Sequence, residues 1–163
     1  MCRCTYQKGA RTQLTVDGVV GIGSPAPKNA RTIRFIIDTG ATATIISATD
    51  GVRLGLNYDS LGIPLLNGNA LKDAGSALGV GGTIRLFYMP KTYITLISSD
   101  RRHKERHTEH VPELLVAEAQ YQDESLLGMD LLQRFNIVIN SQDTTVDLSR
   151  VYVKGTSYFV QNF

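Results

Sequence analysis

Asp38 lies in the tetrapeptide Asp38-Thr39-Gly40-Ala41, the part of this chain whose residue types could carry out chemistry. The largely apolar run 33–37 precedes it, and the β-branched run 42–47 leads away from it. This pattern predicts a strand that delivers a carboxylate to a turn, where small residues let the backbone approach the acid closely. Such a carboxyl can act as a general acid or base. An Asp-Thr-Gly turn alone is more often only a capped turn, so the interpretation depends on other segments.

A glycine-rich stretch, Gly79-Val80-Gly81-Gly82, precedes a predicted strand at 84–88. Glycines at the tip of a hairpin predict a mobile loop that can lie directly on a ligand, with the valine projecting from its tip. The alternative is a flexible hairpin with no ligand.

The segment 126–135 contains an apolar pair, a glycine, and then leucines and a phenylalanine at helical spacing. It predicts a strand that turns at Gly128 into a short helix. The apolar residues, Leu127 among them, are expected in the core. We expect Leu127 and Gly128 to support the turn at Asp38, because a glycine lets the helix pack closely beneath it.

In this order, DTGA at 38–41, GVGG at 79–82 and LLGMDLL at 126–132 resemble the motifs of the retropepsin-type aspartic peptidases. These are the retroviral proteases and their cellular, bacterial and archaeal relatives. The tail at 136–148 is more similar to the cellular branch, such as the DNA-damage-inducible ubiquitin-shuttle proteases, than to the viral one. The resemblance covers 12–148, and the three motifs together are far more specific than any one. It implies that Asp38 is catalytic, that 38–41 form the active-site turn and that 79–82 form a flap.

Two positions depart from the viral pattern. Viral enzymes typically carry an acidic residue two places after the glycine of the turn, paired with an arginine just after the glycine of the helix motif. Thr42 and Met129 stand at these positions here. Because both residues of the ion pair are missing together, the change indicates a different branch of the family and not an inactivated enzyme.

Peptide hydrolysis by this route needs two carboxyls facing one water, and the chain contains one Asp-Thr-Gly. Asp73-Ala74-Gly75 lacks the hydroxyl residue and is not counted as a second copy. The second carboxyl is therefore expected from another copy of the chain across a two-fold axis. The resemblance implies that Thr39 of each chain bonds across that axis. The segment 137–163 alternates apolar residues and is the candidate for part of the interface.

Composition fits one globular domain at 1–163. Its net charge of +2 and scattered basic residues give no case for nucleic acid, and no apolar run approaches the length of a membrane span. The amino terminus lacks the apolar stretch of a signal peptide, so we expect a cytoplasmic location. Cys2 and Cys4 are expected to be free thiols, because two ligands alone do not form a structural zinc site.

The charged tract at 98–110 allows two interpretations. His103 and His107 are four residues apart, with His110 nearby, which suggests a metal site, and its basic residues suggest an anionic partner. The tract has no apolar residue before Val111 to order it, so we expect a solvated, mobile hairpin loop. No metal or organic cofactor is expected.

The rest of the chain predicts short strands with turns between them. Asp17-Gly18 predicts a hairpin between strands at 12–16 and 19–22, and 49–56 could hold a turn of helix. The runs 93–97 and 114–117 are predicted to pair around the charged tract. We expect 1–11 to be flexible and 63–69 to be loop-like.

The sequence therefore predicts an all-β fold, a retropepsin-like closed β-barrel forming an acid-protease half-lobe, with one short helix in the carboxyl-terminal third. The expected function is that of a homodimeric aspartic endopeptidase acting on extended peptide or protein substrates, with apolar side chains favoured beside the cut bond. The alternative is a catalytically silent dimerisation or peptide-binding module of the same fold.

Overall fold

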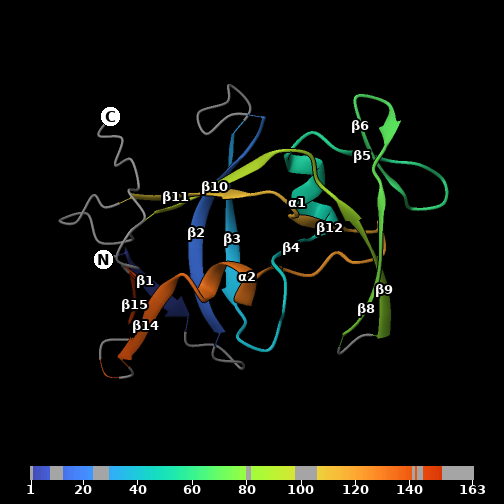
Figure 1. The fold of residues 1–163 in the computed structure, drawn as a ribbon. Helices are drawn as coiled ribbons and strands as arrows, with labels where there is room; N and C mark the ends of the chain where they lie inside the picture. Colours follow the sequence, from blue (N-terminus) through green and yellow to red (C-terminus); the bar gives the residue numbers. More distant parts are fainter. Residues whose placement is uncertain are drawn as a thin grey trace.

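The computed structural model describes residues 2–7, 13–23, 30–79, 82–97, 106–140, 142 and 145–151, and these are mostly strands (Figure 1). The strands are β1 Cys2–Gln7, β2 Gln13–Ile22, β3 Arg31–Ile37, β4 Ile45–Ile46, β5 Asn57–Tyr58, β6 Pro64–Leu66, β7 Asn69–Ala70, β8 Asp73–Gly79, β9 Gly82–Tyr88, β10 Thr92–Ile97, β11 Arg106–Val111, β12 Leu115–Ala117, β13 Ser125–Leu127, β14 Phe135–Asn140 and β15 Thr145–Arg150. The helices are α1 Ala48–Arg53 and α2 Met129–Leu132. Both short helices lie where the sequence predicts helical turns.

One large sheet runs in the order β14-β15-β1-β2-β3-β13-β4-β12-β9-β8, with β10 and β11 branching from β2, and a small sheet joins β5, β6 and β7. The strand β13 lies between β3 and β4, parallel to β3 and antiparallel to β4. Among the described strands the pairings form an open, branched series and not a closed ring. In Figure 1, β1, β14 and β15 lie on the left, the β8–β9 hairpin on the right, and β3 with the loop that follows it between them.

Alternation along β3 separates a buried face from an outward face. Ile33, Phe35 and Ile37 are buried in the main core, whereas Arg34 is exposed and Ile36 is half-buried. Because successive side chains of a strand point to opposite faces, Ile36 shares the outward face with Arg34. The next residue of this series is Asp38, which is also half-buried. The strand therefore fixes Asp38 on a surface backed by a well-packed core.

The predicted hairpin at Asp17-Gly18 is wrong, because β2 continues through both residues. Asp17 pairs with Arg34 of β3 and Gly18 with Ile33. A Cβ on Gly18 would lie 3.1 Å from side-chain atoms of both Ile94 and Phe35. This glycine therefore permits close packing between strands and does not form a turn.

Three further expectations are corrected. Residues 2–7, expected to be flexible, form β1 and pair with β15 and β2. The run 114–117 does not pair with 93–97, since β12 pairs with β4 and β9. Part of 63–69, expected to be loop-like, forms β6 and the start of β7 in the small sheet.

The carboxyl-terminal part of the charged tract is also not a loop. Residues 106–110 belong to β11, which pairs with β10 along its whole length, whereas 98–105 lie outside the described residues. Glu109 is 7% exposed and forms ion pairs with Arg134, at 2.8 Å, and with Arg150. His107 packs edge-on against Phe135, and burial followed by the nearby Arg150 charge lowers the pKa of its imidazole. Besides β10, the partners of this strand, Phe135, Arg134 and Arg150, come from later segments of the chain, which local composition does not reveal.

No helix among the residues described here has the length and apolarity needed to cross a membrane.

Candidate active site

Asp38 opens a tight turn directly after β3. Its backbone N–H donates to the Leu127 carbonyl at 3.1 Å, which extends the pairing between β3 and β13 by one residue. The Gly40 N–H donates to the Asp38 Oδ1 at 2.8 Å, and the Ala41 N–H donates to the Asp38 carbonyl at 3.2 Å. A carboxylate that accepts a bond from the backbone two residues on is fixed in one orientation. The side chain is thus held at the surface by its own turn, with Thr39 and Gly40 exposed beside it.

Gly128 lets the start of α2 lie against the loop that follows this turn. An added Cβ there would lie 2.3 Å from the Ala43 carbonyl oxygen and 2.4 Å from its carbon, closer than atoms can approach. The next residue, Met129, donates its N–H to the Ala41 carbonyl at 2.8 Å. The expected role of Gly128 as a support beneath the turn agrees with this geometry. Leu127 is fully buried and meets the turn through its carbonyl.

A buried side-chain hydrogen bond joins the loop to the helix. Thr44 has no exposed surface, and its hydroxyl donates to Asp130 Oδ1 at 2.7 Å while accepting from the Gly128 N–H at 3.1 Å. The Asp130 N–H also donates to the Thr42 carbonyl at 3.2 Å. Loop and helix are therefore connected without the ion pair typical of viral enzymes. Sequence reasoning missed Thr44 and Asp130, although an acidic residue in the first turn of a predicted helix is a capping signal.

We expect Thr44→Val to lower the free energy of unfolding by about 2 kcal/mol, because it leaves the buried Gly128 N–H without an acceptor and removes the hydroxyl from Asp130. Chemical denaturation measures this loss. Thr42→Val is the matched control, since Thr42 is exposed and its side chain has no hydrogen bond to any residue that the structure describes. Similar losses in the two variants would show that the buried hydroxyl contributes nothing particular.

The β8–β9 hairpin forms at the position predicted for the flap. The two strands pair from Asp73 to Gly79, and the last pair joins Gly79 to Gly82, whose φ of +112° favours glycine. Val80 and Gly81, predicted for the tip, lie outside the described residues. The inner side of the hairpin, including Ala77 and Ile84, packs on a small apolar cluster.

That cluster extends to the strand after the Asp38 loop. Its buried members are Ile45, Leu86 and Ala117, and Tyr121 packs against it. The pKa of the Tyr121 phenol is raised, first by burial and then by the charges of Asp123, Asp38 and Glu124. Tyr121 thus packs against the cluster beneath the hairpin, and the Asp38 charge contributes to the raised pKa of its phenol.

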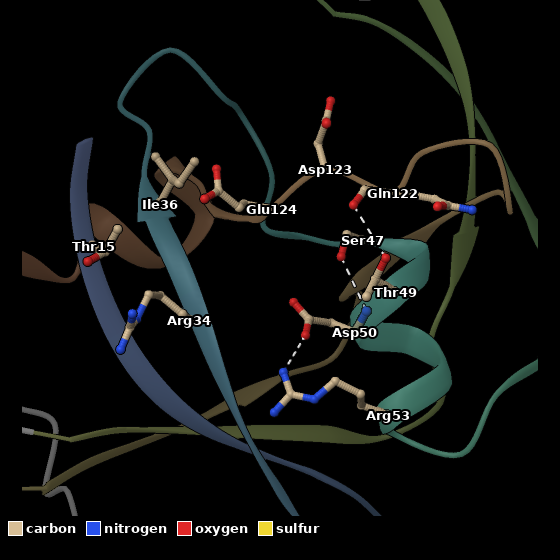
Figure 2. A pocket seen from close by; sticks show the side chains of 10 residues that line it. All are labelled: Thr15, Arg34, Ile36, Ser47, Thr49, Asp50, Arg53, Gln122, Asp123 and Glu124. Carbon is tan, nitrogen blue, oxygen red and sulfur yellow. Dashed lines mark hydrogen bonds and ion pairs between the residues drawn. The ribbon is translucent and has the colours of Figure 1, made fainter. Parts of the chain in front are cut away.

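A pocket of about 440 Å³ opens on the outward face of β3 (Figure 2). Its lining residues come from β2, β3, α1 and the segment before β13: Thr15, Arg34, Ile36, Ser47, Thr49, Asp50, Arg53, Gln122, Asp123 and Glu124. At its α1 side Asp50 accepts from the Ser125 hydroxyl at 2.7 Å and pairs with Arg53 at 2.7 Å. Sequence reasoning did not identify this pocket, whose lining residues are scattered along the chain.

In the part of the chain that the structure describes, no three His, Cys, Asp or Glu side chains gather in a group able to hold a metal ion. His103 of the tract considered for a metal site lies outside the described residues.

Comparison with known proteins agrees with the motifs. Residues 13–86, which contain the Asp38 turn and most of the β8–β9 hairpin, match the family model of aspartyl proteases. This chain resembles the retropepsin-type aspartic peptidases. The crystal structure of a retropepsin-like aspartic protease from Rickettsia conorii is similar with a TM-score of 0.52 and 19% identity, over 90% of this chain and 89% of that chain. At that identity the likeness shows the fold.

The EIAV protease in complex with the inhibitor HBY-793 is similar with a TM-score of 0.44 and 18% identity, over 78% of this chain and 91% of that chain. No curated protein matches the chain. The family model confirms the resemblance to aspartic peptidases predicted from DTGA, GVGG and LLGMDLL, and the Rickettsia conorii protein shares the retropepsin-like fold.

Proposed function

We propose that this protein is a homodimeric aspartic endopeptidase in which the Asp38 carboxyls of two chains activate one water. The observation that carries the proposal is the turn itself. Its carboxylate is fixed by the Gly40 N–H at 2.8 Å, and the turn is anchored to the buried Leu127. Such rigid support is what a catalytic group needs, because small displacements of a catalytic group cost large factors in rate.

In the proposed mechanism one carboxylate removes a proton from the water as its oxygen attacks the peptide carbonyl carbon. The other carboxyl, which is protonated, donates its proton to the carbonyl oxygen. The tetrahedral gem-diol then collapses: one of its hydroxyls returns a proton to the second carboxylate, the C–N bond breaks, and the amine leaves with the proton that the first carboxyl had taken from the water. Each chain contributes one carboxyl, and no residue other than Asp38 is assigned to this step.

The substrate is proposed to be an extended peptide that lies beneath the two flaps and pairs with them as an added strand. The cluster around Ile45, Leu86 and Ala117 lies between the hairpin and the loop after Asp38. It supports the proposal that one subsite favours apolar side chains near the cut bond.

The sheet edge at β14 supports the proposed interface. β14 ends the strand order of the large sheet, and Val138 and Ile139 on it are 57% and 56% exposed. An edge strand with exposed apolar side chains can pair with a second copy. The proposed interface segment 137–163 includes residues 137–140 of this strand, although 152–163 lie outside the described residues.

Activity per chain is expected to fall on dilution, because each chain carries half of the site. Initial rates of peptide cleavage across a concentration series, with sedimentation at the same concentrations, measure this. We expect Val138→Lys to move the midpoint to higher concentration, while Val52→Lys, an exposed valine of α1, leaves it unchanged. Concentration-independent cleavage by a demonstrated monomer would contradict the mechanism.

The test of the function is cleavage of a mixed peptide library by the purified chain at mildly acid pH. Cleavage that disappears in Asp38→Asn supports the proposal. A folded wild-type dimer that cleaves no peptide from pH 3 to 8, a range that spans carboxyl and histidine titration, would favour a silent peptide-binding or dimerisation module.

A further inference from the structure

The pocket beside β3 lies on the same face as Asp38. Ile36 lines the pocket, and it stands two residues before Asp38 on the outward side of the strand. Two strand residues span about 7 Å, so the pocket begins within one side-chain length of the proposed catalytic carboxyl. Across the sheet Ile36 pairs with Leu126 of β13, which is also half-buried. Glu124, immediately before β13, lines the same pocket.

The pocket's wall carries more negative than positive charge. Arg34 and Arg53 both line it, but each already has a carboxylate partner: Arg34 pairs with Asp17 at 3.0 Å and Arg53 with Asp50 at 2.7 Å. Asp123 and Glu124 also line the pocket, and neither has an ion-pair partner among the described residues. Two carboxylates are thus left to face a ligand.

These two carboxylates also lie near the proposed catalytic group. Asp123, Asp38 and Glu124 all raise the pKa of the same phenol, that of Tyr121. Figure 2 shows Glu124 beside the end of β3, where Ile36 projects, with Asp123 farther along the rim toward Ser47 and Thr49. The open volume of about 440 Å³ is within the range of ligand pockets and is ample for one long side chain.

We propose that this pocket is a subsite for a cationic side chain of the substrate, lysine or arginine, with Asp123 and Glu124 as its charge partners. The aliphatic stem of such a side chain lies along Ile36, and its charged end reaches the two carboxylates. This inference rests on the proposed peptidase function and adds a substrate class to it. The site then combines an apolar subsite at the Ile45 cluster with an acidic subsite beside β3. Because Ile36 and Asp38 are two strand residues apart, we expect the basic substrate residue to lie within about two positions of the cut bond.

Paired peptides test the charge directly. Peptides carrying arginine or its uncharged analogue citrulline, and lysine or norleucine, are compared at each position flanking the cut bond. We expect kcat/KM to favour the charged peptide of a pair by roughly tenfold at one position, and the preference to disappear in the double variant D123N/E124Q. The arginine and lysine arms show which cation the pocket takes. Glu113→Gln is the control for loss of charge elsewhere, because Glu113 is exposed and lies outside the pocket, and its substitution removes one negative charge, as each of the two pocket substitutions does.

Binding separates this inference from the proposed catalysis. The same peptide pairs are titrated into the Asp38→Asn chain and its D123N/E124Q derivative by calorimetry. Charge-dependent binding that needs Asp123 and Glu124 supports the subsite even if the wild-type chain cleaves no peptide. Cleavage without a charged preference, or a preference that survives D123N/E124Q, overturns the subsite and leaves the peptidase intact. Equal affinities in every pair also overturn it.

Discussion

The Asp38→Asn variant is expected to lose peptide cleavage completely while it keeps the fold and the dimer. The amide has the shape of the carboxyl and still offers an oxygen to the Gly40 N–H, which donates to Asp38 Oδ1 in the wild-type turn. An amide cannot ionise, however, so neither chain of the dimer retains a general base. We expect turnover to fall by about four orders of magnitude, the upper end of the range for general acid–base catalysis. Single-turnover assays with circular dichroism and sedimentation measure activity, fold and assembly together.

The pH profile of wild-type turnover should be bell-shaped, because the proposed mechanism needs one ionised and one protonated carboxyl. In the proposed dimer the two Asp38 carboxyls lie within hydrogen-bond distance of each other. Two such carboxyls cannot both ionise cheaply, so we expect the pair to hold one proton between them over a window of acid pH. Below that window both carboxyls are protonated and the base is lost. Above it the shared proton is lost, and the two charges repel across the interface. We expect the dimer to weaken along the upper limb in the wild type but not in Asp38→Asn.

Wild-type cleavage by Asp38→Asn would show that another group is the catalyst. A variant that is inactive because it no longer folds would be recognised by its circular dichroism, and Asp38→Ser would then provide a second test. A dimer whose stability is the same on both limbs of the wild-type profile would contradict a shared proton, since that proton should link assembly to pH.

The sequence predicted the elements that carry the site because they depend on local chemistry. The strand 33–37 alternates and leads into small residues, and Gly128 interrupts two apolar runs, so both were recognisable without tertiary information. The structure agrees at β3, at β13 and at α2. The glycines at 79 and 82 likewise predicted the hairpin that joins β8 to β9.

What the sequence did not predict depends on distant contacts. Gly18 has the local signature of a turn, but the packing of Ile94 and Phe35 against it keeps β2 extended. The tract 106–110 has the composition of a loop, but it pairs with β10, and Glu109 is buried with ion pairs to Arg134 and Arg150. Thr44 and Asp130 are 86 residues apart, and their hydrogen bond appears only when the loop and α2 are brought together. Local propensity is overridden in each case by a tertiary contact.

Replacement of Gly128 by alanine should cause the largest loss of stability from a single added methyl group. The Cβ would lie 2.3 Å from the Ala43 carbonyl oxygen and 2.9 Å from the Thr44 nitrogen, and both are backbone atoms that cannot rotate away. The backbone at Gly128 has a φ of −95°, so the cost is steric and not conformational. To admit the methyl group, α2 must move away from the loop. That movement breaks the bonds that Met129 and Asp130 donate to it.

We expect Gly128→Ala to lower the free energy of unfolding by about 3 kcal/mol or more, the upper part of the range for overpacked sites. Gly68→Ala is the informative comparison. Gly68 has a φ of +80°, and no atom lies within 4 Å of the place that an added methyl group would take, so only the left-handed conformation opposes alanine there. That penalty is about 1 kcal/mol. Urea denaturation of both variants distinguishes the two causes, and a loss at Gly128 no larger than at Gly68 would show that the loop yields easily.

Turnover then reports whether the contact also positions the catalyst. The loop that the methyl group displaces begins at Asp38, whose N–H is bound to the Leu127 carbonyl immediately before Gly128. A displacement of α2 should therefore also shift Asp38, because the bond from the Asp38 N–H to the Leu127 carbonyl connects the two segments. We expect Gly128→Ala, measured at a temperature where it remains folded, to lose cleavage with little change in KM, whereas Gly68→Ala keeps both parameters. If Gly128→Ala had the same KM and the same kcat as the wild type, the glycine would serve the stability of the fold and not the geometry of the active-site turn.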